Sequence, residues 1–145
     1  MKTVIFSLIF TLSLLVNAKA ESIAVIVNVN NPNHTLSKKQ LIDLYMGRYV
    51  AFPNQQQAQP LDISTPNDLK RAFYLRLVKM PLSRVNSYWS RVSFTGRASP
   101  PFKKDDEQTV IQYVGDNKNA IGYVNFNTLA KLDSKNVKVV LELNE

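Results

Sequence analysis

The segment DISTPNDLKRAFYLRLV, residues 62–78, passes from a predicted strand into a predicted helix. Residues 60–63 fit a short strand. Thr65 is placed to cap the following helix, with Pro66 at the first helical position and Asp68 at the third. Apolar residues then recur at steps of four and predict the buried stripe of this helix: Leu69, Phe73 and Leu77. A strand followed directly by an amphipathic helix is typical of an α/β layered domain.

The chain before this segment also contains a predicted strand followed by a predicted helix. Residues 22–29, SIAVIVNV, are rich in β-branched residues and predict a strand inside a sheet. Ser37 can cap a helix, and Gln40 stands three residues later as its capping-box partner. Gly47 fits the position just past the end of that helix. Residues 48–59, with a run of glutamines, predict an exposed loop.

Further elements follow towards the C-terminus. Ser83 begins a predicted helix with Trp89 on its apolar side, and Asp105 or Asp106 caps another that ends at Gly115. The inward residues of this second helix are Val110, Ile111 and Val114. The remaining elements are strands at 121–125 and 137–143 and a short helical turn at 127–133. Strands separated by helices predict one α/β domain, with no linker that would divide it.

The first twenty residues, MKTVIFSLIFTLSLLVNAKA, have the layout of a secretory signal peptide. A lysine precedes an apolar run that is short for a membrane span, and an A-x-A pattern follows. We therefore expect residues 1–20 to be removed by cleavage after Ala20, which leaves a domain of residues 21–145. The expected location is the bacterial periplasm.

Charge and cysteine usage exclude several classes of protein. The chain carries 18 basic and 11 acidic side chains, a formal net charge of +7, and two of the lysines lie in the predicted signal peptide. The basic residues are dispersed and no nucleic-acid motif accompanies them, so no nucleic-acid partner is expected. The absence of cysteine excludes disulfides, thiolate metal sites and a cysteine nucleophile.

No constellation of residues predicts catalysis. His34 is the lone histidine and has no paired acid near it in the sequence. The one acidic cluster, residues 105–107, lies where the start of a helix favours negative charge. No hydrolase, zinc-protease, P-loop or dinucleotide motif is present. We expect a protein that is not an enzyme, with no catalytic residue, no metal site and no cofactor.

The strand-to-helix junction predicts an anion site. Ligands of α/β sheets gather at the carboxyl ends of strands, where helix N-termini present free N–H groups. Ser64 and Thr65 offer hydroxyls, Asn67 a carboxamide, and Arg71 a guanidinium that can hold an oxyanion through two hydrogen bonds. The alternative is that these residues only cap the helix, and Asp68 would repel an anion.

A second candidate contact lies in the loop YWSRVSFTGRASPP, residues 88–101. Gly96 permits a positive φ, which would present Thr95 and Arg97 on either side of a tight turn. Arg97 could then contact an anion or simply face solvent.

Four segments together resemble a known family: LSKKQLIDLYMGR, DISTPNDLKRAFYLRLV, YWSRVSFTGRASPP and VIQYVGDNKNAIGYV. They resemble the short secreted relatives of the phosphate-binding proteins of ABC transporters, in the type II periplasmic binding protein superfamily. The resemblance runs from about Ser22 to Val124. It implies an α/β fold with one lobe, a mixed sheet flanked by helices.

The same resemblance implies a function and partners. The implied function is capture of phosphate or a related oxyanion for an ABC transporter, with the transporter permease as a partner and a homodimer as a way to rebuild a two-lobed cleft. Two features depart from the family: the chain suffices for one lobe, and residues 67–69, Asn-Asp-Leu, stand where relatives carry Ser-Gly-Thr. The alternative function is an interaction module that docks on a periplasmic sensor or membrane complex without carrying solute.

Overall fold

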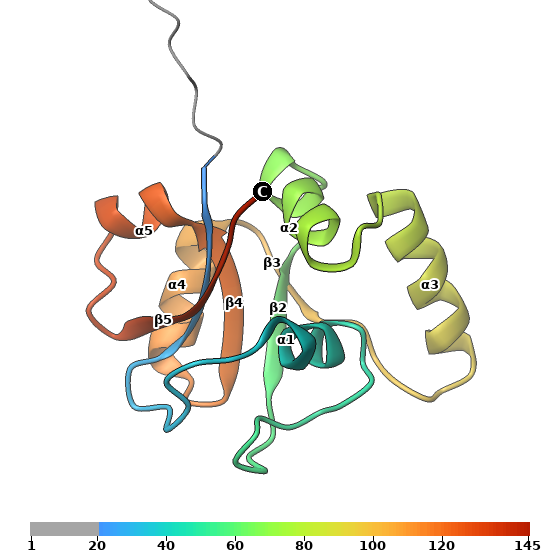
Figure 1. The fold of residues 1–145 in the computed structure, drawn as a ribbon, viewed down its shortest axis with the longest axis horizontal. Coiled ribbons are helices and arrows are strands. Elements are labelled where there is room, and N and C mark those ends of the chain that lie inside the picture. The colour runs from blue at the N-terminus through green and yellow to red at the C-terminus, as the bar shows by residue number, and fades with distance from the viewer. Residues whose placement is uncertain (1–20) are drawn as a thin grey trace, which may run out of the picture.

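A mixed sheet flanked by helices forms the centre of the molecule in the computed structural model, which describes residues 21–145 (Figure 1). The predicted signal peptide and its cleavage site after Ala20 therefore concern residues outside the described part. The elements in chain order are β1 (Ile23–Asn28), α1 (Lys38–Tyr45), β2 (Gln59–Ile63), α2 (Asp68–Val78), α3 (Leu82–Phe94), β3 (Phe102–Lys104), α4 (Glu107–Asp116), β4 (Ala120–Asn125), α5 (Phe126–Lys131) and β5 (Val137–Leu143).

The strands lie in the order β3-β2-β4-β1-β5. β2 pairs in parallel with both β3 and β4, whereas β1 pairs antiparallel with β4 and β5. All six residues of β1 are buried, because neighbouring strands flank it on both sides and helices cover the sheet. The predicted α/β class with a mixed sheet is confirmed.

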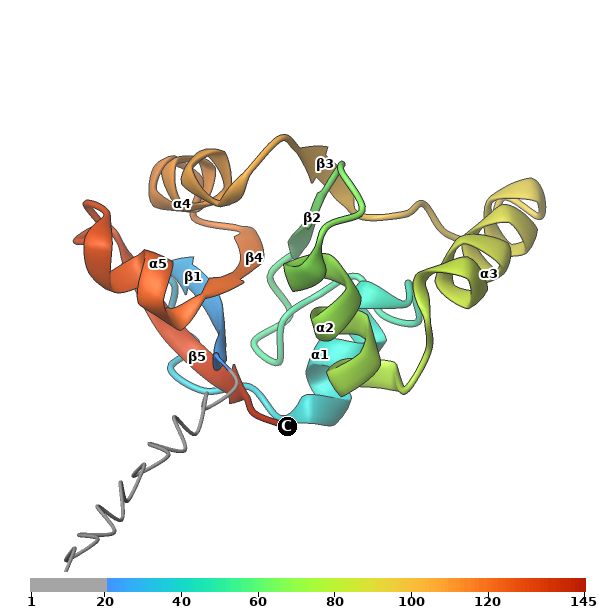
Figure 2. The same cartoon turned by 90° about the horizontal axis from the view of Figure 1, so that it is seen from above.

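The helices cover both faces of the sheet. Gly122 and Tyr123 are successive residues of β4, so they face opposite sides. Gly122 faces α4, where an added Cβ would lie 2.5 Å from a methyl of Val110. Tyr123 faces α2, and its ring stacks on Phe73 with the centroids 3.7 Å apart. α2 and α4 therefore pack on opposite faces, and α3 lies outside α2 at the periphery (Figure 2). No helix within residues 21–145 has the length and apolar character to cross a membrane.

Several predicted helix ends are confirmed. Ser37 and Gln40 form the expected capping box at the start of α1, and Gly47 follows its end with φ +68°. Asp106 caps α4 by accepting from the backbone N–H of Thr109. These ends were predictable because a cap side chain and the backbone N–H that donates to it lie within three residues of each other.

Other predicted ends are wrong. Asn67, not Thr65, caps α2, because its side chain accepts from the N–H of Lys70 while proline at 66 favours extended backbone before it. Gly115 lies inside the last turn of α4 rather than past its end. α3 begins at Leu82, after Pro81, without a side-chain cap.

Two parts of the chain were not predicted as they fold. β3 was missed, since its three residues include two lysines and only its parallel pairing with β2 makes it a strand. The loop at 48–59 is mostly exposed, but Phe52 is fully buried and Ala51 forms a bridge to Gln57. The loop is therefore anchored to the core.

Candidate functional site

The carboxyl ends of β2 and β3 lie side by side, because the two strands are parallel and adjacent. The backbone N–H of Ser64 donates to the Lys104 carbonyl at 2.9 Å and extends the pairing by one residue. Four residues separate β2 from α2, and α4 begins shortly after β3. This edge of the sheet, here called the junction, contains four of the predicted site residues: Ser64, Thr65, Asn67 and Arg71.

The junction residues differ in what they already contact. The Asn67 carboxamide oxygen accepts from the N–H of Lys70 at 2.9 Å, so it is occupied as the helix cap. Ser64 is half-buried and Thr65 is exposed. Neither hydroxyl has a hydrogen-bond partner within residues 21–145. These two hydroxyls therefore have hydrogen-bonding capacity to offer a ligand, as do the N–H groups of Arg71 that do not contact Asp68.

Arg71 pairs with Asp68 one turn earlier on α2. Its Nη1 lies 3.0 Å from the Asp68 carboxylate, and the two side chains are 57% and 105% exposed relative to a free residue. Exposed pairs at this spacing contribute only about 0.3–0.5 kcal/mol, so the guanidinium can leave the pair at small cost.

Three further acidic residues follow β3 on this edge. Asp106 caps α4, and hydrogen bonds from Thr109, first from its backbone N–H and then from its hydroxyl, lower the Asp106 pKa. Glu107 accepts from the backbone N–H of Asn125 at 2.7 Å and from its carboxamide at 3.2 Å. Asp105 is exposed. Asp106 and Glu107 are thus engaged by protein donors, and the hydrogen bonds from Thr109 stabilise the negative charge of Asp106 near the junction.

Thr95 and Arg97 do not join the junction. They follow the C-terminal end of α3, which lies at the far side of the molecule from the carboxyl end of β2 (Figure 1). Gly96 has the predicted positive φ of +68°, but the Thr95 hydroxyl donates to the Val92 carbonyl at 2.7 Å. The two loops therefore do not meet in one place, because α3 runs away from the sheet edge before the second loop begins.

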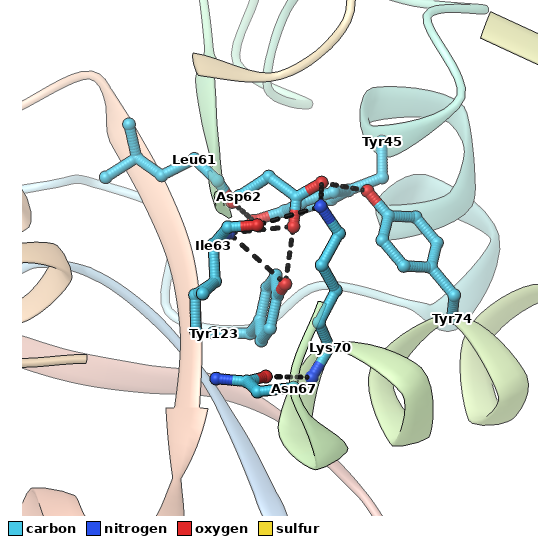
Figure 3. Close-up of polar contacts among 8 residues, drawn as sticks. All are labelled: Tyr45, Leu61, Asp62, Ile63, Asn67, Lys70, Tyr74 and Tyr123. Carbon is cyan, nitrogen blue, oxygen red and sulfur yellow. Dashed lines mark hydrogen bonds and ion pairs between the residues drawn. The ribbon is translucent and has the colours of Figure 1, made fainter. Parts of the chain in front are cut away.

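A buried polar network lies directly beneath the junction and was not predicted from the sequence. Asp62 of β2 accepts from the Tyr74 hydroxyl at 2.7 Å, from the Tyr123 hydroxyl at 2.5 Å and from the N–H of Ile63 at 2.8 Å. Figure 3 shows Lys70 reaching from α2 to the end of β2, where its ammonium donates to the Ile63 carbonyl at 2.8 Å. The network links β2, β4 and α2 through side chains.

The electrostatics of the network follow from burial. Burial, together with the Asp62 carboxylate, raises the pKa of Tyr45, Tyr74 and Tyr123 well above the usual value of a phenol. The three phenols therefore remain neutral donors. Tyr45 uses its hydroxyl on the Leu61 carbonyl at 2.8 Å. The network keeps β2 and α2 in a defined relative position, which fixes the backbone of the junction.

The sequence held one signal for this network. Lys70 and Tyr74 are four residues apart and each follows a residue of the buried stripe, so they share one side of α2 next to that stripe. Asp62 stands between two apolar residues of a strand. An acid, a lysine and a tyrosine at positions that face the same layer indicate a buried polar cluster.

Within residues 21–145, no group of three or more histidine, cysteine or acidic side chains is arranged to hold a metal ion. His34 is exposed, with Nδ1 3.3 Å from the Lys138 ammonium.

Comparison with known proteins identifies the fold. No protein-family model and no curated protein matches the chain in sequence. Among solved structures it matches an ABC-type phosphate transport receptor from Vibrio cholerae, with a TM-score of 0.62, 16% identity and coverage of 84% of this chain and 47% of the receptor. It also matches PstS from Borrelia burgdorferi, with a TM-score of 0.61, 10% identity and coverage of 86% and 47%.

A third match is a substrate-binding protein assigned to a phosphate ABC transporter, solved with bound phosphate, from Clostridium perfringens. Here the TM-score is 0.57 at 16% identity, over 88% of this chain and 57% of that one. The chain spans about half the length of the structures it matches. At these identities the likeness establishes the fold alone, which is the α/β fold of about half of each matched structure.

Proposed function

We propose that this chain binds phosphate or a related small oxyanion at the junction. The observation that carries the proposal is the pair of unengaged hydroxyls, Ser64 and Thr65, at the carboxyl end of β2 directly before α2. The first turn of α2 adds backbone N–H groups without intrahelical acceptors and the positive end of the helix dipole. Sheets of this class bind anions at such an edge.

Arg71 supplies the charge. It lies one turn into α2, and its exposed pair with Asp68 is weak enough to be exchanged for a ligand. A guanidinium presents two parallel N–H groups to an oxyanion, which suits phosphate, sulfate and carboxylates. The net charge of +7 over the whole chain favours approach of an anion.

The proposed role is that of a periplasmic solute-binding domain for an ABC transporter. The phosphate-transport proteins that share the fold support this role, as does the secretory pattern of residues 1–20. A chain with half their length covers one side of a ligand, so a second copy or a membrane permease would cover the other. Affinity in the isolated domain is expected to be modest, because less of the ligand is removed from water.

Calorimetric titration of the purified protein with phosphate and with sulfate tests the proposal. We expect saturable binding of at least one anion, reduced about tenfold in Arg71→Gln by loss of a charge-assisted contact. Arg91→Gln is the matched control, because Arg91 is also an exposed helical arginine but lies in the last turn of α3. Absence of binding, or equal losses in the two variants, would contradict the proposal.

A second candidate function is docking on a periplasmic sensor or membrane complex without solute. The observation in its favour is exposed aromatic surface on the two sides of the α3–β3 connection, where Phe94 is 95% and Phe102 is 57% exposed. A photo-crosslinker at position 94 should then capture one defined partner, and the same crosslinker at the exposed position 75 of α2 should not. Capture of no partner in expressing cells would count against docking.

A further inference from the structure

A groove of about 380 Å³ lies between α3 and the edge formed by β2 and β3. Its lining includes the apolar side chains of Val85, Trp89 and Pro101 and the polar side chains of Asp62, Lys70, Ser90 and Lys103. None of the four predicted junction residues lines it. The groove is therefore separate from the proposed oxyanion site, although both lie against the same buried network.

Lys70 lines this groove and has one N–H group that no protein acceptor uses. Its ammonium carries three N–H groups. One donates to the Ile63 carbonyl at 2.8 Å, and the Asp62 carboxylate lies 3.4 Å away, so at most two are engaged. The side chain is only 8% exposed, so water competes weakly for the remaining donor.

Trp89 supplies a second unsatisfied donor. Its indole Nε1 is the one buried side-chain polar atom without a hydrogen-bond partner within residues 21–145. A buried donor left without an acceptor costs about 1–3 kcal/mol. An acceptor brought into the groove relieves this cost if the indole turns towards it.

The charges of the groove select the class of ligand. Lys70 and Lys103 carry two positive charges against the one negative charge of Asp62. Asp62 already accepts from Tyr74, Tyr123 and Ile63, so it has little capacity to accept from a ligand. The balance is one positive charge beside an apolar wall, which suits one negative charge on an apolar body better than a phosphate dianion.

We propose that this groove binds a small organic monoanion, with its carboxylate near Lys70 and Lys103 and its apolar body against Val85 and Trp89. The volume is in the range of small-molecule sites. The proposal does not depend on anion binding at the junction, because the two sites share no ligand-contacting side chain.

Trp89 is the sole tryptophan of the chain, so its fluorescence and its single indole N–H resonance report directly on the groove. The probe is cyclohexanecarboxylate, and cyclohexanecarboxamide is the neutral control of the same shape. We expect a saturable change in Trp89 emission and a downfield shift of the indole proton with the carboxylate, and binding at least about tenfold weaker with the amide.

Lys103→Gln and Lys104→Gln form a matched pair on β3. Lys103 lines the groove, whereas the Lys104 ammonium lies 3.7 Å from the centre of the Tyr113 ring, away from the groove. We expect Lys103→Gln to weaken carboxylate binding about threefold to tenfold and Lys104→Gln to leave it unchanged. No saturable change in either signal, equal binding of acid and amide, or equal effects of the two substitutions would overturn the proposal.

Arg71→Gln separates the two proposed sites. It is expected to weaken phosphate binding at the junction and to leave carboxylate binding in the groove unchanged. Carboxylate binding that falls with Arg71→Gln and not with Lys103→Gln would place the probe at the junction and overturn the groove assignment.

Discussion

The Asp62 carboxylate and the Lys70 ammonium lie 3.4 Å apart, each in a side chain that is only 8% exposed. The pair connects the carboxyl end of β2 to the first turn of α2. Tyr74, Tyr123 and the Ile63 backbone complete its hydrogen bonds. A buried pair of this kind is strongly sensitive to loss of one partner, because the other charge is then left without compensation.

Lys70→Met should therefore destabilise the protein by about 3–5 kcal/mol, measured by urea denaturation. Lys39→Met is the control, because Lys39 also pairs with an acid, Asp43 at 2.6 Å, but its side chain is 84% exposed. The control should lose less than about 1 kcal/mol. Similar losses in the two variants would show that burial does not govern the strength of the Asp62–Lys70 pair.

Alanine substitutions at two glycines with the same φ distinguish the cost of backbone strain from the cost of a packing clash. Gly47 and Gly96 both have φ +68°. A Cβ added at Gly47 would lie 2.8 Å from Trp89 and from Ala98, whereas a Cβ added at Gly96 would have no neighbour within 4 Å. Gly96→Ala should cost about 1–2 kcal/mol from the backbone alone. Gly47→Ala should cost about 1–3 kcal/mol more, because the indole must move. The same urea midpoint for Gly47→Ala and Gly96→Ala would contradict the close contact at Gly47.

Alkaline pH should destabilise the protein through its buried tyrosines. Their pKa is raised in the folded state, so above the unfolded value of about 10 the folded chain binds more protons than the unfolded chain. Their contribution to stability is complete below about pH 10 and is lost as the pH rises beyond it. Urea unfolding on either side of this pH, with near-UV absorbance of tyrosinate, measures the effect. Ionisation of all tyrosines while the circular dichroism remains native would contradict it.

Asp68→Asn should strengthen oxyanion binding at the junction. The substitution removes a negative charge and releases Arg71 from its 3.0 Å pair, so phosphate affinity is expected to rise about twofold to fivefold. The gain should shrink at high salt, since the groups are exposed. Calorimetry at two ionic strengths measures it, and Asp116→Asn, at the end of α4, is the control. An unchanged or lower affinity would place the anion away from Asp68.

Helix caps and apolar stripes were predicted correctly where the interacting residues are close together in the sequence. The capping box of Ser37 and Gln40, the Asp106 cap and the stripe of Leu69, Phe73 and Leu77 each depend on groups within one or two turns. The N-cap of α2 was missed because Thr65 and Asn67 are both good caps, and the choice between them depends on the path of the chain after β2.

The candidate site was predictable in part. Ser64, Thr65, Asn67 and Arg71 were placed at one junction because they are close in sequence and follow a strand. Thr95 and Arg97 were a second candidate contact, and the direction of α3 places them away from the junction; no local pattern encodes that direction.

The caps, the apolar periodicity and the alternation of strands with helices were sufficient to predict the α/β class and most elements, because these signals act over a few residues. The order of strands, the formation of β3 and the meeting of Asp62 with Lys70 and Tyr123 depend on contacts between distant segments. Such contacts form when the sheet assembles and buries the groups together, so their geometry and the raised pKa of Tyr123 exist in the folded domain and not in any single segment.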